Sequence, residues 1–268
     1  MFMDDVKLLS FAILTWNSER TIGACLKGIS DKCTEESIEY EVCIVDNGSR
    51  DSTVKIIKYG FKDLPVNLIR LNRNMGTTVS GNIALKRCRG DVLCVLDSDA
   101  IFLDGRIGQI VSLLEDKSVA LVAPRLILPD GTVQNSAKKF PSVLSKLLKI
   151  PGIILKRETW NRDFYGDFPF SYVKEVDTAI SACWFFNQEL PDEVGFFDER
   201  FFYGPADVDF CLRIRKAGKK IVYCPNVTML HHTHHITHKR PFSTIALIHL
   251  WGLIYYFYKH RYIVRPKF

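Results

Sequence analysis

"EYEVCIVDNGSRDST" (Glu39–Thr53) is the stretch that decides the fold of this chain. Its apolar run at 42–45 is short and stops at Asp46, which is typical of a buried strand. A glycine turn follows, and Asp51 or Ser52 stands where a helix would begin. The stretch therefore predicts a strand, a polar turn and a helix in direct succession.

The same succession recurs along the first half of the chain, where apolar runs alternate with helical patterns. Such alternation indicates βαβ units. We therefore expect an α/β fold, with a single Rossmann-like domain and a mostly parallel central sheet flanked by helices. The expected strands are 7–14, 42–45, 66–71, 90–97 and 119–124, and the expected helices lie within 19–32, 72–88 and 106–116.

Polar residues gather where four of these predicted strands end. Ligands of open parallel sheets bind beyond the carboxyl ends of the strands, so four polar ends predict a binding site there. The residues at these ends are Thr15 and Asn17, Asp46 and Asn47, Asn72 and Asn74, and Asp97 and Asp99.

The second half of the chain has a less regular pattern. "LILPDGTVQ" (126–134) predicts a hairpin with Asp-Gly at its turn. Residues 137–175 have no clean period, and we expect a long loop region over the site. Strands are expected at 176–186 and 219–225, and a helix at 207–218 with Gly218 at its end.

The composition is that of a folded soluble protein, with 47% apolar and 25% charged residues. The N-terminal stretch has acidic residues where a secretory signal would be basic, so we expect no signal peptide. Eight cysteines are scattered without a C-x-x-C pair, which favours reduced, buried thiols in a cytoplasmic protein.

The charge is unevenly distributed along the chain. After Asp209 there is no acidic residue and there are eleven Lys or Arg residues, so an anionic partner is expected at the C-terminal end. Residues 242–258 are nearly all apolar, and this run is at the short limit for spanning a bilayer. It favours a helix at the membrane face, with peripheral contact through 242–268, or else a helix packed on the catalytic domain.

Asp97 and Asp99 stand two residues apart at the end of a predicted strand. Two carboxylates this close repel each other unless a cation or hydrogen-bond donors offset their charge. A hard divalent cation, Mg²⁺ or Mn²⁺, fits oxygen ligands of this kind. A solvated turn that caps the next helix is the alternative, and the residues alone leave both open.

Taken together, these motifs resemble glycosyltransferase family 2, the inverting nucleotide-sugar transferases, and within it the rhamnosyltransferase-like branch. The resemblance spans about residues 7–232. It implies a catalytic domain at 1–240, with a nucleotide-binding half (1–100) and an acceptor half (101–240), followed by an amphipathic helix and tail at 241–268. The matching segments are "AILTWNSE", "IVDNGSRDST", "NRNMGTTVSGN", "GDVLCVLDSDA" and "VGFFDERFFYGPADVDFCLRIRKAG…YCPNVTMLHH".

The resemblance also implies roles for individual residues. Asp46 would contact the base of a uridine or thymidine nucleotide, and Asp97 would face the ribose. Asp99 would hold a Mn²⁺ or Mg²⁺ that bridges the diphosphate, and His231 would be a further metal or phosphate ligand. The other residues implied for the nucleotide pocket are Thr15, Asn17, Asn74, Gly76, Asn82 and Ser98.

The acceptor side departs from the family pattern. The family usually has Glu-Asp-x-Asp, and this chain has Ala206-Asp207-Val208-Asp209. If Asp207 is the base, the chain is active. If the missing Glu was the base or its partner, the chain is impaired. Asp209 is a second catalytic candidate, or else caps its helix, and Trp184 would stack on a sugar or lie in the core.

The expected function is metal-assisted, inverting transfer of a sugar from a UDP- or dTDP-sugar to a glycan or lipid-linked acceptor. It would occur in the cytoplasm, at the inner membrane face, in cell-surface polysaccharide biosynthesis, and no nucleic acid is expected as a partner. One alternative is a nucleotide-sugar-binding form without turnover, because Ala206 replaces Glu. A nucleotidyltransferase is disfavoured because "LTWNSER" has no glycine, and a zinc site in "HHTHHITH" is disfavoured because no Glu or Cys cluster accompanies it.

Overall fold

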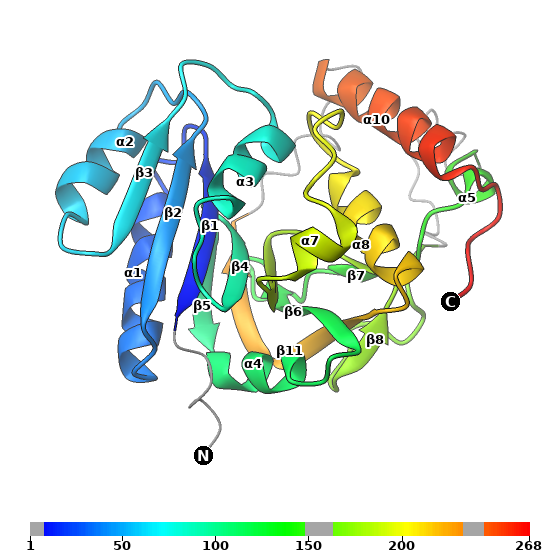
Figure 1. The fold of residues 1–268 in the computed structure, drawn as a ribbon, viewed down its shortest axis with the longest axis horizontal. Helices are drawn as coiled ribbons and strands as arrows, with labels where there is room; N and C mark the ends of the chain where they lie inside the picture. Colours follow the sequence, from blue (N-terminus) through cyan, green and yellow to red (C-terminus); the bar gives the residue numbers. More distant parts are fainter. Residues whose placement is uncertain (1–7, 148–162, 233–243) are drawn as a thin grey trace.

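The computed structural model describes residues 8–147, 163–232 and 244–268. Its centre is a nine-stranded sheet with helices on both faces (Figure 1). The sheet order is β3-β2-β1-β4-β10-β6-β11-β5, and β8 pairs with β11. The strands of this sheet are β1 (Leu9–Thr15), β2 (Tyr40–Asp46), β3 (Val66–Arg70), β4 (Val92–Asp97), β5 (Ala100–Asp104), β6 (Val119–Ile127), β8 (Lys174–Val176), β10 (Cys183–Asn187) and β11 (Lys220–His231).

The first four strands of the sheet order are parallel, as the sequence predicts. β1 and β2 are buried almost throughout, which is why they are continuous apolar runs instead of alternating ones. Their register places Thr15 beside Asp46, and Leu14 beside Asp97. The polar ends of these strands therefore lie at one edge of the sheet.

The helices divide the apolar core into two clusters, one on each face of the sheet. α1 packs on one face and α3 on the other, and α2 continues into a π-helical turn at Ile56–Gly60. The described helices are α1 (Ile22–Glu35), α2 (Thr53–Lys55), α3 (Thr77–Leu85), α4 (Ile107–Leu114), α5 (Val143–Leu147), α7 (Leu190–Val194), α8 (Ala206–Lys216) and α10 (Thr244–His260).

The second half makes the sheet mixed, which corrects the expectation of a mostly parallel one. β10 lies antiparallel between β4 and β6, and β5 and β8 lie antiparallel to β11. The described strands of this sheet form four parallel and four antiparallel pairings. The α/β class is confirmed, because helices still cover both faces.

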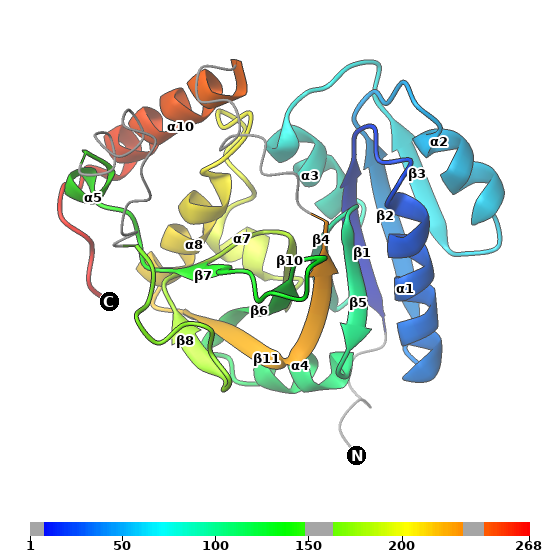
Figure 2. The ribbon, with the colours of Figure 1, turned by 180° about the vertical axis from the view of Figure 1, so that it is seen from behind.

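β11 is the strand that joins the two halves of the molecule. It pairs with β6, its register shifts between Cys224 and Thr228, and its last part pairs with β5 (Figure 2). This path ends with His231 opposite Ala100, the residue that follows Asp99. The irregularity thus carries a histidine from far along the chain to the end of β4.

Several local predictions are confirmed. Leu128 and Thr132 close the Asp-Gly hairpin, and Gly131 has the positive φ of 82° that its turn needs. Gly218, with φ of 76°, follows the last turn of α8. All eight cysteines are free and buried.

Residues 137–175 contain short elements that the sequence did not predict, while 148–162 lie outside the described residues. β7 (Ala137–Lys138) pairs with β9 (Thr178–Ala179) in a separate two-stranded sheet. α5 follows β7 in the chain and lies near the C-terminal end of α10 (Figure 1). The predicted boundary at 240/241 also falls outside the described residues.

α10 packs closely on the loop that leads into α8. A Cβ on Gly252 would lie 2.7 Å from the carbonyl oxygen of Gly204, so glycine allows the two backbones to approach. Tyr256 of the same helix is fully buried. Within the described residues, no helix combines the length and apolar character needed to cross a bilayer.

Candidate active site

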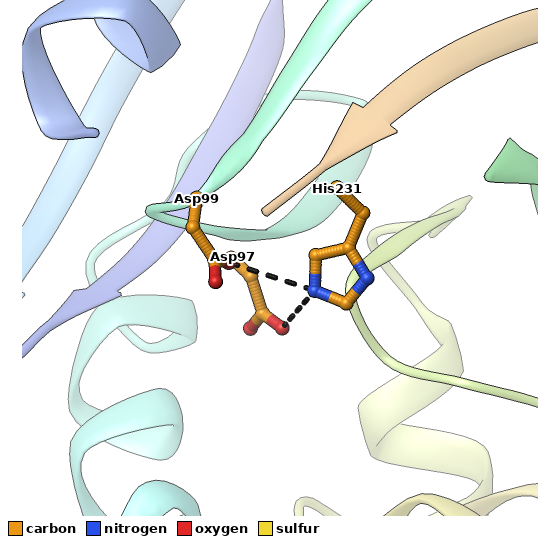
Figure 3. A group of neighbouring side chains, drawn as sticks. All are labelled: Asp97, Asp99 and His231. Atoms are coloured by element: carbon orange, nitrogen blue, oxygen red, sulfur yellow. Dashed lines mark ion pairs between the residues drawn. The ribbon is translucent and has the colours of Figure 1, made fainter. Parts of the chain in front are cut away.

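Asp97, Asp99 and His231 converge at the carboxyl end of β4 (Figure 3). Asp97 ends β4, Asp99 lies in the turn before β5, and His231 ends β11. The His231 Nε2 atom lies 3.6 Å from Asp99 Oδ1 and 3.9 Å from Asp97 Oδ2. Both carboxylates and one imidazole nitrogen therefore face a common point.

Gln134 orients the imidazole of His231. The Nδ1 atom lies 2.7 Å from Gln134 Oε1, an acceptor, so Nδ1 carries the proton and donates it to this bond. The Nε2 atom then offers its lone pair toward the two aspartates. A hydrogen bond of this kind to the far nitrogen is the usual support of a metal-binding histidine.

The electrostatics of the acid turn favour a cation. Burial, together with the negative charges of Asp99 and Asp207, raises the pKa of Asp97 to about 8. A divalent cation would remove this penalty by pairing with the ionised carboxylates. Two carboxylates and one imidazole fit Mn²⁺, which accepts oxygen and nitrogen ligands, and the carboxylates also fit Mg²⁺.

A cavity of about 740 Å³ opens beside this cluster. Its walls come from the β4–β5 turn, the start of α3, the β7 region, the first turn of α8 and the inner face of α10. The residues that line this cavity include Asp97, Asp99, Gln134, Lys138, Lys139, Tyr203, Ala206, Asp207, His231, His249 and Leu253.

A smaller hollow of about 350 Å³ lies at the ends of β1, β2 and β3. Asn17 and Asn74, two of the residues implied for the nucleotide pocket, line it. Asn17 is held in place because its Oδ1 accepts from Arg50 N at 2.9 Å. Asn74 Oδ1 accepts from Asn47 Nδ2 at 2.8 Å and from Gly76 N at 2.9 Å.

Asp46 and Thr15 lie buried behind these residues. Asp46 Oδ1 accepts from Thr15 Oγ1 at 3.2 Å, and Asp46 Oδ2 accepts from Ser49 N at 3.1 Å. Neither side chain belongs to the lining of either cavity. Ser98 is similarly engaged, since its hydroxyl lies 2.8 Å from that of Ser18. These residues hold the strand ends in register in this structure.

Gly76 and Asn82 connect α3 to the segment before α8. Gly76 has φ of 90°, and a Cβ there would lie 2.7 Å from the carbonyl oxygen of Phe202. Asn82 donates to the Phe197 carbonyl and to Glu199, each at 2.9 Å. Asn82 is buried and outside the cavity lining, so the structure does not bring it to the predicted pocket.

The structure separates the two acids of α8. Asp207 lines the cavity, and its Oδ1 accepts from Val208 N at 2.8 Å. Burial raises the pKa of Asp207, although the Val208 hydrogen bond and the positive charge of Lys138 act in the opposite direction. Ala206 also lines the cavity, so the position of the missing Glu faces the same space.

Asp209 lies on the other side of α8, away from the cavity, so the structure does not bring this second catalytic candidate to the site. It is fully buried and contacts Arg213 Nε at 3.0 Å, Lys259 Nζ at 2.5 Å and His260 Nε2 at 2.8 Å. The last two residues belong to the end of α10. Asp209 therefore fastens α10 to α8.

Trp184 lies in the core, and the expectation that it stacks on a sugar is wrong for this structure. Its ring is fully buried and stacks on Phe210, with a centroid distance of 5.7 Å and an interplanar angle of 20°. Its neighbour Phe197 stacks on it at 6.2 Å. β10 is a central strand with helices on this face, so its side chains meet the core.

Five residues of the cavity lining were not predicted from the sequence: Gln134, Lys138, Lys139, Tyr203 and His249. Gln134 follows the Asp-Gly hairpin, but nothing local shows that it reaches a histidine almost a hundred residues away. Lys138 and Lys139 lie in the stretch without a clean period. For His249, the available signal was a single histidine inside the apolar run at 242–258.

Solved structures with the same fold include two complexes with nucleotides and manganese. The chain matches the mannosyltransferase PcManGT from Pyrobaculum calidifontis, in complex with GDP-Man and Mn²⁺, with a TM-score of 0.63 and 19% identity. That match covers 97% of this chain and 66% of the other. It matches GalNAc-T7, solved with UDP, GalNAc and Mn²⁺, with a TM-score of 0.64, 16% identity, and coverage of 86% and 44%. The chain therefore shares the fold of these proteins.

Sequence comparison identifies the family. The model for glycosyl transferase family 2 matches residues 10–195, which is more than half of the chain. The chain belongs to glycosyltransferase family 2, and it is a glycosyltransferase.

Curated relatives agree with the rhamnosyltransferase-like branch. An N-acetylglucosaminyl-diphospho-decaprenol L-rhamnosyltransferase of Mycobacterium tuberculosis is 28% identical over 222 residues, 78% of this chain and 71% of that protein. An undecaprenyl-phosphate 4-deoxy-4-formamido-L-arabinose transferase of Pseudomonas fluorescens is 32% identical over 186 residues. The second match covers 66% of this chain and half of that protein.

Proposed function

We propose that this protein transfers a sugar, with inversion, from a UDP- or dTDP-sugar to a lipid-linked acceptor or glycan. One observation carries the proposal: Asp97, Asp99 and His231 lie on one wall of a single cavity, and Asp207 lies on another wall. One wall would serve the leaving diphosphate and the other the incoming hydroxyl. This division of roles is what an inverting displacement needs.

The donor side would be formed by the two cavities together. Asn17 and Asn74 would contact the nucleotide in the smaller hollow, with Thr15, Asp46, Gly76, Asn82 and Ser98 fixing the backbone around it. Asp97 would face the ribose. Asp99 and His231 would hold Mn²⁺ or Mg²⁺, which supplies positive charge for the leaving diphosphate.

Asp207 would act as the base of the reaction. The acceptor oxygen attacks the anomeric carbon from the face opposite the nucleotide, and the bond from that carbon to the diphosphate oxygen breaks. Its electron pair leaves with the nucleoside diphosphate, and the hydroxyl proton passes to the Asp207 carboxylate. Because burial raises the pKa of Asp207, the group is a stronger base than an exposed aspartate.

Two features support a lipid-linked acceptor at the inner face of the cytoplasmic membrane. The relative from Mycobacterium tuberculosis is named for such an acceptor, and that from Pseudomonas fluorescens for a polyprenyl phosphate. α10 also exposes apolar and aromatic side chains on its outer face, while its inner face packs on α8. This exposed stripe consists of Leu247, Leu250, Trp251, Ile254 and Tyr258. A role in cell-surface polysaccharide synthesis follows from an acceptor of this kind.

Calorimetric titration with UDP and dTDP, each with and without Mn²⁺, tests the donor side. We expect one of them to bind in the presence of Mn²⁺ and to bind at least tenfold more weakly to Asp99→Asn. The variant Asp104→Asn is the matched control, because Asp104 is an exposed acid at the far end of β5. Absence of binding by either nucleotide with the metal present would contradict the proposal.

A second candidate, a nucleotide-sugar-binding protein without turnover, is favoured by Ala206 in the cavity wall. Comparing the chain with Ala206→Glu separates the two. We expect the chain to hydrolyse or transfer the sugar by itself, with Glu changing the rate modestly. Turnover by Ala206→Glu alone would favour the second candidate.

A further inference from the structure

The acceptor side of the cavity has positive charge that the proposed reaction does not use. Lys138 and Lys139 of the β7 region line the cavity, and His249 of α10 lines it from the opposite helix. We call these three residues the acceptor-side basic cluster. The charge of the donor diphosphate would be offset by the cation held at Asp99 and His231, so the two lysines can serve a different anion.

The lysines of the cluster are not held by ion pairs within the described part of the chain. Each lies over an aromatic ring instead: Lys138 Nζ is 5.5 Å from the Phe164 centroid, and Lys139 Nζ is 5.3 Å from that of Tyr165. Lys146, which lines the same cavity, differs because it pairs with Asp163 at 2.9 Å. Two ammonium groups thus face the cavity with aromatic support and, among the residues that the structure describes, without an ion-paired carboxylate.

Burial makes this arrangement costly unless an anion arrives. Burial lowers the pKa of Lys138, and the nearby carboxylate of Asp207 partly opposes that effect. The positive charges of Lys138 and His249 act to lower the pKa of Asp207, against the effect of burial. The cluster therefore lies within electrostatic reach of the proposed base, on the side where the acceptor would enter.

The cavity becomes apolar along α10. Leu253 lines the cavity one turn after His249, and Gly252 packs against the loop before α8. On the outer face of the same helix, Leu250, Trp251 and Ile254 are exposed. Asp207, the acceptor-side basic cluster and Leu253 thus line one cavity, and the helix that carries His249 and Leu253 has an apolar outer face.

We propose that Lys138, Lys139 and His249 bind the phosphate group of a lipid-linked acceptor, next to the sugar whose hydroxyl faces Asp207. This inference rests on the proposed function and specifies its acceptor. Ammonium groups that are partly buried form strong, charge-assisted hydrogen bonds with phosphate oxygens. The apolar surface of α10 would then receive the start of the lipid chain.

Geranyl diphosphate is a suitable probe, with geraniol as the uncharged comparison. Binding is measured by calorimetry in EDTA, so that a metal bridge at Asp99 cannot contribute. We expect geranyl diphosphate to bind better than geraniol, about tenfold more weakly to Lys138→Gln, and about a hundredfold more weakly to Lys138→Gln/Lys139→Gln. Lys138→Arg should recover most of the loss.

Two controls make the result specific. Lys58→Gln removes the same charge from an exposed site in the π-helical turn at Ile56–Gly60 and should change nothing. UDP or dTDP binding with Mn²⁺ should be equal in the chain and in the lysine variants, which also shows that these variants fold.

The outcomes distinguish this inference from the proposed function. Normal nucleotide binding, with geranyl diphosphate binding that ignores Lys138 and Lys139, would overturn the inference alone. Loss of nucleotide binding in the unmodified chain would contradict the proposed function. A third outcome would overturn the phosphate inference: methyl glucuronide binds in a Lys138-dependent way and geranyl diphosphate does not. The cluster would then recognise a sugar carboxylate.

Discussion

The donor side and the acceptor side of the cavity are built in different ways. The donor side comes from consecutive strand ends, and Thr15, Asp46 and Asp97 lie on neighbouring parallel strands. The acceptor side comes from segments far apart in sequence: β7, the start of α8 and the inner face of α10. Consecutive strand ends therefore form most of the donor wall, which His231 and Gln134 complete from far along the chain, and long-range packing assembles the acceptor wall. If the two walls are independent, a substitution on one wall should leave the other intact.

The largest effect is expected from Asp207→Asn. Removing a general base slows the chemical step by about 10²–10⁴-fold, while the donor wall is left intact. We expect kcat to fall by that factor with nucleotide affinity unchanged, measured by product formation and by calorimetry. If the variant keeps full activity, Asp207 is not the base. Asp192→Asn, on the exposed helix α7, is the matched control.

Asp209→Ala tests the attachment of α10 to α8. It would leave the charges of Lys259, Arg213 and His260 without their buried partner, which costs about 3 kcal/mol of unfolding free energy. Chemical denaturation would measure the loss. Asp31→Ala removes an exposed ion pair with Lys27 and should cost less than about 1 kcal/mol. A loss at position 209 no larger than this would contradict the structural role.

The same attachment predicts an acid limit to stability. Although burial opposes it, hydrogen bonds from His260 and Lys259 lower the pKa of Asp209 below its unfolded value. This stabilisation is complete above about pH 4, the unfolded pKa of aspartate, and is lost as the pH falls through the folded pKa. Denaturation midpoints of the chain should drop below about pH 4. The drop should be smaller in Asp209→Asn.

Gln134→Ala should weaken metal binding about 10–100-fold, because His231 would lose the bond that fixes its tautomer. Titration with Mn²⁺, followed by electron paramagnetic resonance, measures this directly. Gln109→Ala, at an exposed position of α4, is the matched control. Equal affinities of both variants would contradict the orienting role of Gln134.

The pH dependence of Mn²⁺ affinity tests the same metal site. Burial and the charges of Asp99 and Asp207 raise the pKa of Asp97 to about 8, and a cation held at Asp99 and His231 would favour the ionised carboxylate beside it. Metal binding should therefore release a proton below that pH. Mn²⁺ affinity should therefore rise by up to about tenfold per pH unit between pH 6 and 8 and then level off. Asp97→Asn should flatten this dependence. A flat profile in the unmodified chain would contradict the assignment.

The smallest effect is expected at the outer face of α10. Trp251 is 70% exposed, and an aromatic ring there would enter the interface of a membrane. Trp251→Ala should reduce flotation with anionic liposomes several-fold without changing nucleotide binding. Tyr59→Ala, an equally exposed residue remote from α10, should have no effect. Unchanged flotation of the Trp251 variant would argue against membrane contact through this helix.

The sequence by itself predicted the elements whose signals are local. Apolar runs that end in polar residues predicted β1, β2 and β4, and the Asp-Gly and Gly218 signals predicted a turn and a helix end correctly. The acid turn of Asp97 and Asp99 was also evident, because both residues belong to one short segment. His231 was found through the family resemblance.

The tertiary structure decided which way the side chains face. Asp207 and Asp209 are two residues apart on one helix, so about 200° of rotation separates them, and packing of α10 against α8 buries the second. Trp184 became a core residue because β10 is inserted between two strands instead of lying at an edge. Gln134, Lys138 and His249 reached the cavity through the path of β11, the β7–β9 pairing and the Gly252 contact. These contacts join residues from 40 to 97 positions apart, and no local pattern encodes them.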